Sequence, residues 1–224
     1  ISRRCNVCVS MNLADIRREY LLAGLRRADL DANPLAQFQK WFEQAAKILA
    51  QKEMDVNAAT LATADKNGKP SARIVLLKNL DERGLIFFTN YDSRKGREIS
   101  ENPNAALVFY WPPLERQICV AGSVQKISRA ESEAYFQSRP RGSQLAAWAS
   151  QQSGVVENRV ALEAKWSELD KQFPGEVPLP PDWGGLVLRP ERMEFWQGRA
   201  NRLHDRFQYT RQENDLWKLE RLSP

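Results

Sequence analysis

Residues 58–89 read AATLATADKNGKPSARIVLLKNLDERGLIFFT, and this segment indicates the fold class more clearly than any other. Three short runs rich in β-branched, apolar and aromatic residues predict β-strands. Turn-forming residues separate them, first Lys66-Asn67-Gly68 and then the segment from Asp81 to Gly84. Strands joined by such short turns pair antiparallel, so the stretch predicts an antiparallel sheet or barrel. The expected strands are Ala58–Ala64, Ala72–Lys78 and Leu85–Thr89.

Similar patterns extend the sheet towards the C-terminus and add helices around it. Asn33 can cap a helix whose first turn holds Pro34, and Ser128 forms a capping box with Glu131 at the start of another. The sequence therefore predicts an α+β fold, a barrel wrapped by helices. Further strands are expected at Ala105–Trp111, Gln117–Ile127, Leu186–Leu188, Met193–Trp196, Arg206–Thr210 and Leu216–Leu222, and helices at Leu13–Leu25, 33–48, Ser93–Asn102, 128–136, Ser143–Ala149 and Glu157–Phe173.

The chain contains neither repeats nor a linker between domains, so we expect residues 11–224 to form one domain. Residues 1–10, ISRRCNVCVS, have basic character but lack the apolar core of a secretory signal. We interpret them as a cloning remnant or as the end of a targeting segment.

Composition places the chain among globular proteins of a reducing compartment, and we expect it to be cytoplasmic. No apolar run approaches the roughly 20 residues that span a bilayer, so we expect no membrane contact. Cys5, Cys8 and Cys119 form no disulfide framework, and Cys5 with Cys8 is only half of a zinc-site spacing, so we expect no metal. The net charge of +5 is interleaved with acidic residues, which disfavours nucleic acid and favours small phosphorylated ligands.

The common glycine-rich and nucleophile motifs are absent, since the sequence has neither GxGxxG, nor GxxxxGK[ST], nor GxSxG. Anions must therefore be bound mainly by side chains, and three clusters offer cations and hydroxyl groups. Each cluster alone is equally compatible with a solvated face, whereas together they predict two separate phosphate sites. The clusters are Arg73 with Lys78; Ser93, Arg94 and Lys95; and Tyr135, Arg139 and Ser143.

Glu194–Arg206, EFWQGRANRLHDR, contains the single histidine of the chain and is the segment most suited to chemistry. If it is a strand, Arg202, His204 and Arg206 point to the same side, because strand side chains alternate with a period of two. The alternative is a solvated strand with a satisfied histidine.

Six motifs that occur in order along the chain closely resemble the pyridoxine (pyridoxamine) 5'-phosphate oxidase family. The resemblance extends from about Ile16 to Pro224, nearly all of the chain after Met11. The motifs are RIVLLK at Arg73–Lys78, FFTN at Phe87–Asn90, SRKG at Ser93–Gly96, LERQ at Leu114–Gln117, YFQSRPRGSQ at Tyr135–Gln144, and EFWQGRANRLHDR at Glu194–Arg206.

The resemblance implies a homodimeric FMN-binding split barrel, α+β, that holds the flavin at the subunit interface. Arg17 and Tyr20, in the segment RREY, resemble the N-terminal segment of the family that closes over the substrate. The implied substrate phosphate ligands are Lys78, Tyr135, Arg139 and Ser143, with Arg202 and His204 facing the pyridine ring. The implied FMN contacts are Arg73, Lys78, Arg94 and Lys95 to its phosphate, and Ile74, Val75, Leu76, Leu77, Phe88, Thr89, Gln117, Gln152, Ser153, Trp196 and Arg206 to the rest.

The resemblance also implies the reaction: FMN accepts a hydride from pyridoxamine or pyridoxine 5'-phosphate, and O2 reoxidises the flavin with release of H2O2. We predict that Arg202 covers the free face of the pyridine ring and that His204 orients a polar substituent or the leaving proton. Two rivals remain open. A flavin reductase-like split barrel would have no use for the substrate set, and a carrier of flavin or pyridoxal 5'-phosphate would share every contact without turnover.

Overall fold

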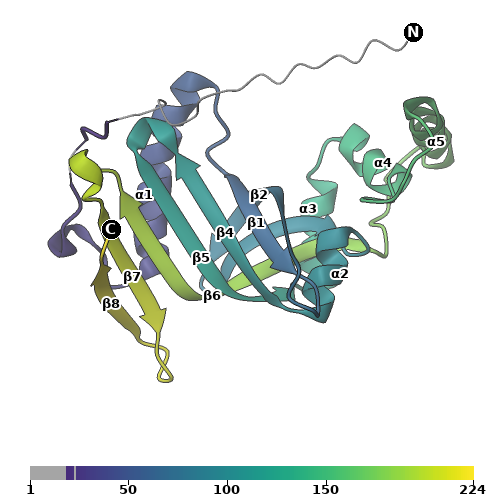
Figure 1. The fold of residues 1–224 in the computed structure, drawn as a ribbon. Coiled ribbons are helices and arrows are strands. Elements are labelled where there is room, and N and C mark those ends of the chain that lie inside the picture. Colours follow the sequence, from purple (N-terminus) through teal and green to yellow (C-terminus); the bar gives the residue numbers. More distant parts are fainter. Residues whose placement is uncertain (1–18, 23) are drawn as a thin grey trace, which may run out of the picture.

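The strands form a closed antiparallel barrel with two extra strands at one side (Figure 1). The computed structural model describes residues 19–22 and 24–224. The strands are β1 Ala58–Ala64, β2 Pro70–Asp81, β3 Gly84–Asn90, β4 Asn104–Trp111, β5 Arg116–Lys126, β6 Trp183–Gln197, β7 Asp205–Arg211 and β8 Trp217–Leu222. They follow the order β3-β2-β1-β4-β5-β6-β7-β8, and β3 also pairs with β6, which closes the first six strands of this order into a barrel. The predicted α+β barrel is confirmed.

Strand β6 joins the barrel to the two outer strands. One of its edges pairs with β5 over residues 186–197, whereas the other edge pairs first with β3 and then with β7. Pro190, which has no N–H, lies between these two partners and opposite Gly122, where the register with β5 shifts. The prediction of two strands, Leu186–Leu188 and Met193–Trp196, is therefore wrong, because Pro190 interrupts the apolar pattern but not the strand.

Helices lie against both sides of the barrel, and most begin at the predicted caps. Asn33 accepts a hydrogen bond from the N–H of Leu35 (2.9 Å), and Ser128 and Glu131 form the predicted capping box. The described part of the expected helix Leu13–Leu25, residues 19–22 and 24–25, is not helical, and the rest lies outside the described residues. The helices are α1 Pro34–Leu49, α2 Arg94–Glu101, α3 Arg129–Gln137, α4 Arg141–Ala149 and α5 Arg159–Gln172; in the described part of the chain no helix is both long and apolar enough to cross a membrane.

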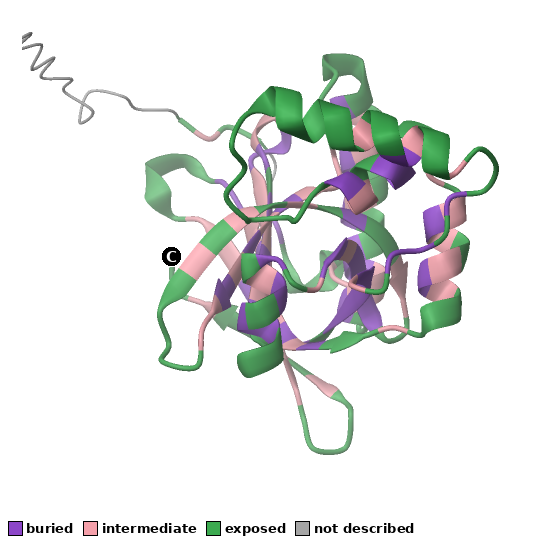
Figure 2. Cartoon of the chain, turned by 90° about the vertical axis from the view of Figure 1, so that its right-hand side faces the viewer, coloured by how far each residue is buried: buried purple, intermediate pink, exposed green. Residues whose placement is uncertain are grey.

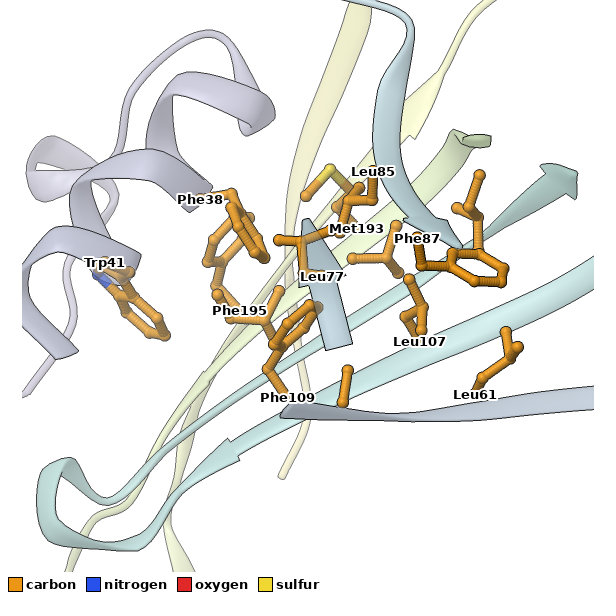
Figure 3. Packing of buried hydrophobic residues seen from close by; sticks show 14 of the residues in the cluster. Phe38, Trp41, Leu61, Leu77, Leu85, Phe87, Leu107, Phe109, Met193 and Phe195 are labelled. Carbon is orange, nitrogen blue, oxygen red and sulfur yellow. The ribbon is translucent and has the colours of Figure 1, made fainter. Parts of the chain in front are cut away.

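The barrel interior and α1 form one hydrophobic core (Figure 3). Phe38 of α1 packs edge-on against Phe109 of β4, with ring centroids 5.0 Å apart. Trp41 packs edge-on against Phe195 of β6 at 5.3 Å. This geometry suits the quadrupoles of the rings, so α1 stabilises the side of the barrel that carries β4 and β6.

A second, smaller hydrophobic cluster lies among α3, α4, α5 and the start of β6. It is built on Phe136, Leu145 and Trp183. Helix α5 adds only Leu169 as a buried residue, and Figure 2, which views the molecule from this side, shows the long helix almost entirely exposed. This cluster holds the turn between α3 and α4 against the barrel.

Candidate active site

A pocket lies where β2 and β3 separate. Strand β3 pairs with β2 only over Leu77–Asp81, with a register shift at Lys78. The β2 residues before Leu77 pair with β1 on one edge, and within the described residues no strand pairs with their other edge. The pocket that opens there has a volume of about 290 Å³. Its walls contain many of the predicted ligand contacts together with Trp183, which the sequence reasoning missed. The lining residues are Ile74, Val75, Leu76, Lys78, Phe88, Thr89, Lys95, Tyr135, Arg139, Gln152 and Trp183.

Arg73 and Arg94, two predicted phosphate ligands, converge on Glu98, a buried carboxylate in the middle of α2. Glu98 accepts hydrogen bonds from Arg94 Nε (2.8 Å) and Arg73 Nη2 (3.3 Å). Burial alone would raise the pKa of Glu98, but hydrogen bonds from Ser71, Thr63 and Arg94 and the charge of Arg73 lower it to about 2. At neutral pH the carboxylate is therefore charged and holds both guanidinium groups.

Lys95 supplies a cation at the pocket wall. Its Nζ donates to Gln152 Oε1 (2.6 Å) and Thr89 Oγ1 (3.0 Å). Burial, and secondly the positive charge of Arg73, lower the pKa of Lys95 to about 8. An anion bound beside Lys95 would favour its charged form, so this corner of the pocket suits a phosphate group.

Aromatic rings form another wall of the pocket. Phe88 and Tyr135 stack with centroids 3.8 Å apart, and Trp183 lies nearly parallel to Tyr135, with 4° between the ring planes. The guanidinium of Arg139 lies over Trp183 at 4.7 Å. Its Nη1 is buried without a hydrogen-bond partner, the one such side-chain atom found among the described residues. An unpaired buried donor costs free energy, and this one belongs to a guanidinium that lines the pocket.

The pocket is not lined by three other predicted residues, Leu77, Ser143 and Ser153. Ser143 lies in the first turn of α4, and the backbone N–H of Arg94 donates to Ser153 Oγ (3.2 Å). The side chain of Leu77 is buried in the barrel core rather than in the pocket. Helix α3 ends at Gln137, so Arg139 does not share its face with Tyr135 but reaches the pocket from the turn before α4.

The loop after β6 gathers another set of predicted residues at a different place. Trp196 and His204 have ring centroids 4.6 Å apart, and Tyr20 packs edge-on against both at 5.5 Å. His204 Nδ1 accepts a hydrogen bond from the N–H of Arg199 (3.1 Å). Burial and the charge of Arg202 lower the pKa of His204, so at neutral pH the ring is neutral and carries its proton on Nε2.

Arg202 and His204 do not lie in a strand, so the condition under which all three side chains would point to one side is not met. Residues Ala200–Arg202 form a 3₁₀ turn in which Asn201 and Arg202 have positive φ angles of 56° and 60°. Strand β7 begins only at Asp205, so it contains just Arg206 of the three predicted residues. Arg206 is engaged by Glu194, to which it donates twice (2.8 and 3.0 Å). No periodic pattern marks a left-handed turn without glycine.

The outer face of the sheet connects these two places. Residues in register on neighbouring strands share a face of the sheet. One such row crosses five strands through successive partners: Ile74 of β2, Thr60 of β1, Val108 of β4, Cys119 of β5 and Glu194 of β6. This row points away from the barrel core, and Ile74 is 63% exposed. A neighbouring row carries Gln117, Trp196 and Arg206 across β5, β6 and β7.

The predicted site residues thus fall into two groups within one chain. The loop 198–204, at the upper left of Figure 1, lies far from α2 and α3 on the right, and no residue of the second group lines the pocket. Arg17 lies outside the described residues. The pocket group comprises Arg73–Lys78, Phe88, Thr89, Arg94, Lys95, Tyr135, Arg139, Ser143, Gln152 and Ser153; the loop group comprises Tyr20, Gln117, Trp196, Arg202, His204 and Arg206.

Known proteins resemble this chain in fold and in sequence. Among solved structures, PhzG from Burkholderia lata 383, in complex with tetrahydrophenazine-1-carboxylic acid, superposes with a TM-score of 0.84 at 31% identity and covers 92% of this chain and 100% of its own. A pyridoxamine 5'-phosphate oxidase-related, FMN binding protein from Nostoc punctiforme superposes with a TM-score of 0.68 at 22% identity, over 84% of this chain and 97% of its own. The fold is that of the FMN-binding split barrels.

The sequence comparisons are more specific. A family model described as pyridoxamine 5'-phosphate oxidase matches residues 43–173, and one described as the pyridoxine 5'-phosphate oxidase C-terminal dimerisation region matches residues 183–224. The pyridoxine/pyridoxamine 5'-phosphate oxidase 1 of Ralstonia nicotianae is 56% identical over 95% of this chain and 99% of its own length. The corresponding oxidase of Nostoc punctiforme is 54% identical over 95% and 98%. The chain belongs to the pyridoxine/pyridoxamine 5'-phosphate oxidase family of oxidoreductases.

Proposed function

We propose that this enzyme oxidises pyridoxamine 5'-phosphate and pyridoxine 5'-phosphate to pyridoxal 5'-phosphate with FMN as cofactor, O2 as electron acceptor and H2O2 as product. The observation that carries the proposal is the pocket at the barrel split, which combines cations, flat aromatic rings and the unpaired guanidinium atom of Arg139. The named relatives of similar length support it.

The pocket residues fit an FMN molecule by their chemistry. Arg73, Lys78, Arg94 and Lys95 would hold the phosphate, and the β2 edge at residues 74–76 would lie along the ring system. When bound, FMN supplies the two-electron acceptor for the substrate carbon. The protein's own part is to hold the substrate ring flat and close, which lowers the barrier through orientation.

The substrate phosphate would be bound by Lys78, Tyr135, Arg139 and Ser143. Arg139 contributes most to this site, because its Nη1 has no other partner and its guanidinium is fixed over Trp183. Burial lowers the pKa of this guanidinium, and a bound phosphate would offset that cost.

We further propose that each complete site contains the pocket group of one subunit and the loop group of the other. Both groups border the same outer face of the sheet, and the family's dimerisation region, residues 183–224, includes most of the loop group. In a two-fold dimer the same face meets itself, so the β6–β7 side of one copy can cover the β2 side of its partner. Arg202 and His204 of the partner would then face the pyridine ring.

Binding of FMN is expected to weaken as the pH rises through about 8, because Lys95 is protonated below this pKa and neutral above it. Titrating the quenching of flavin fluorescence at several pH values would measure this. Lys95→Met should bind FMN weakly throughout and lose the dependence. If FMN binding to Lys95→Met still weakened as the pH rises through about 8, the pH dependence would belong to another group.

His204→Ala is expected to lower kcat/KM for pyridoxamine 5'-phosphate about tenfold, because the variant loses one hydrogen bond to a charged partner and such a bond contributes about that much. The Nε2 proton is the donor that this variant removes, since Nδ1 is engaged by Arg199. Steady-state kinetics with FMN saturating is the measurement. Near-normal kinetics would refute the role.

The function itself is tested by following pyridoxal 5'-phosphate and H2O2 together after pyridoxamine 5'-phosphate is added to the FMN-loaded enzyme. Equal amounts of the two products are expected. Since PhzG is a structural neighbour, tetrahydrophenazine-1-carboxylic acid is the informative competing substrate. Turnover of that acid without turnover of either B6 phosphate would overturn the proposal.

A further inference from the structure

Glu98 is a buried carboxylate beside the phosphate-binding cations, and neither the sequence motifs nor the family resemblance assigned it a role. Its side chain is 7% exposed, and both of its oxygens are engaged. Oε2 accepts hydrogen bonds from Thr63 Oγ1 (2.5 Å), Ser71 Oγ (2.5 Å) and Arg73 Nη2 (3.3 Å). Oε1 accepts from Arg94 Nε (2.8 Å). One carboxylate therefore connects strands β1 and β2 with helix α2.

This arrangement fixes both guanidinium groups. Arg73 is held on one side by the carbonyl of Leu61 (3.3 Å) and Thr63 Oγ1 (2.5 Å), and on the other by Ser71 and Glu98. Arg94 is held only by its Nε, and its terminal amino groups have no hydrogen-bond acceptor among the described residues. Arginine without such support has several freely rotating bonds, and ordering them costs free energy when a ligand binds.

We propose that Glu98 is a positioning residue that prepares Arg73 and Arg94 to receive the FMN phosphate. The inference rests on the proposed use of FMN. Glu98 would increase the affinity for FMN only indirectly, because its own negative charge repels the phosphate and its benefit comes from holding the two arginines.

Two effects of Glu98 have opposite signs, so the direction of a measured change distinguishes them. If only charge mattered, removing a negative group beside the cations would tighten FMN binding. If the positioning of the two arginines dominates, removal of the same negative group weakens FMN binding. A glutamine at this position has one oxygen and one amino group, so whichever way it turns, one arginine faces a donor in place of an acceptor.

The experiment compares FMN with riboflavin, which lacks the phosphate, on Glu98→Gln and the unchanged protein. We expect the Kd of FMN to rise about tenfold in Glu98→Gln, and the Kd of riboflavin to stay the same. Glu101→Gln, the same substitution at the exposed last residue of α2, is the matched control and should change neither Kd.

Three results would overturn the inference: unchanged FMN affinity, tighter FMN binding, or equal weakening of FMN and riboflavin, which would reveal a general loss of structure. Thermal unfolding of each variant checks the last of these independently. If the unchanged protein bound no FMN, the proposed function would fail, whereas normal binding in both proteins would refute only the role of Glu98.

Discussion

Heterodimers of two inactive variants, Arg139→Ala and Arg202→Ala, are expected to be active. Arg139 belongs to the pocket group and Arg202 to the loop group, and the fold keeps these groups apart within one chain. If each site takes one group from each subunit, the heterodimer has one site with both substitutions and one with neither. Each homodimer, by contrast, carries its one substitution at both sites, so neither of its sites is intact.

Coexpression with two different affinity tags yields the heterodimer for assay. It should have about half the activity of the unchanged dimer, while each homodimeric variant loses most of its activity at low substrate concentration. The control is the double variant paired with an unchanged chain, which should leave both sites defective. An inactive heterodimer of the two single variants would mean that each site lies within one chain.

Val108→Asp is expected to abolish both the dimer and flavin binding. Val108 lies in the central row of the outer face, between Thr60 and Cys119, and its side chain points away from the barrel core. A carboxylate buried between two copies without a partner would cost several kcal/mol, so the two-fold contact should not form. A folded monomer should remain, because the core-facing neighbours Leu107 and Phe109 are unchanged.

Light scattering gives the mass of this variant, and fluorescence titration gives its affinity for FMN. Val160→Asp places the same substitution on α5 at a position that is 72% exposed, and it should remain dimeric and bind flavin. Since Val108 does not line the pocket, a Val108→Asp monomer with normal FMN affinity would show that one chain completes the flavin site alone.

Local signals predicted most of the fold. Strands β1 to β5 follow apolar alternation and turn residues, and α1 and α3 begin at side-chain caps that satisfy their first N–H groups. The failures arose where tertiary structure overrides a local pattern. Pro190 remains within β6 because the strand changes its partner there. The left-handed turn at Asn201 and Arg202 prevents the strand alternation that was considered for residues 202–206.

The candidate site was predictable as a set of residues but not as an arrangement. The motifs named the contacts of the pocket, yet nothing in the sequence separates them from Trp196, Arg202 and His204, which the barrel places elsewhere. Trp183 and Glu98 were missed because a tryptophan after a proline-rich stretch and a glutamate within a charged helix are common features of solvated or packed segments. Only the converging hydrogen bonds distinguish Glu98 from an ordinary surface acid.

The visible spectrum of the purified protein shows whether it is an FMN-dependent oxidase of B6 phosphates. The spectrum is followed without oxygen as pyridoxamine 5'-phosphate is added, and air is then admitted. We expect a flavin band that bleaches with substrate and returns with oxygen. A bound flavin whose band never bleaches, or no flavin band even after FMN is added, would contradict it.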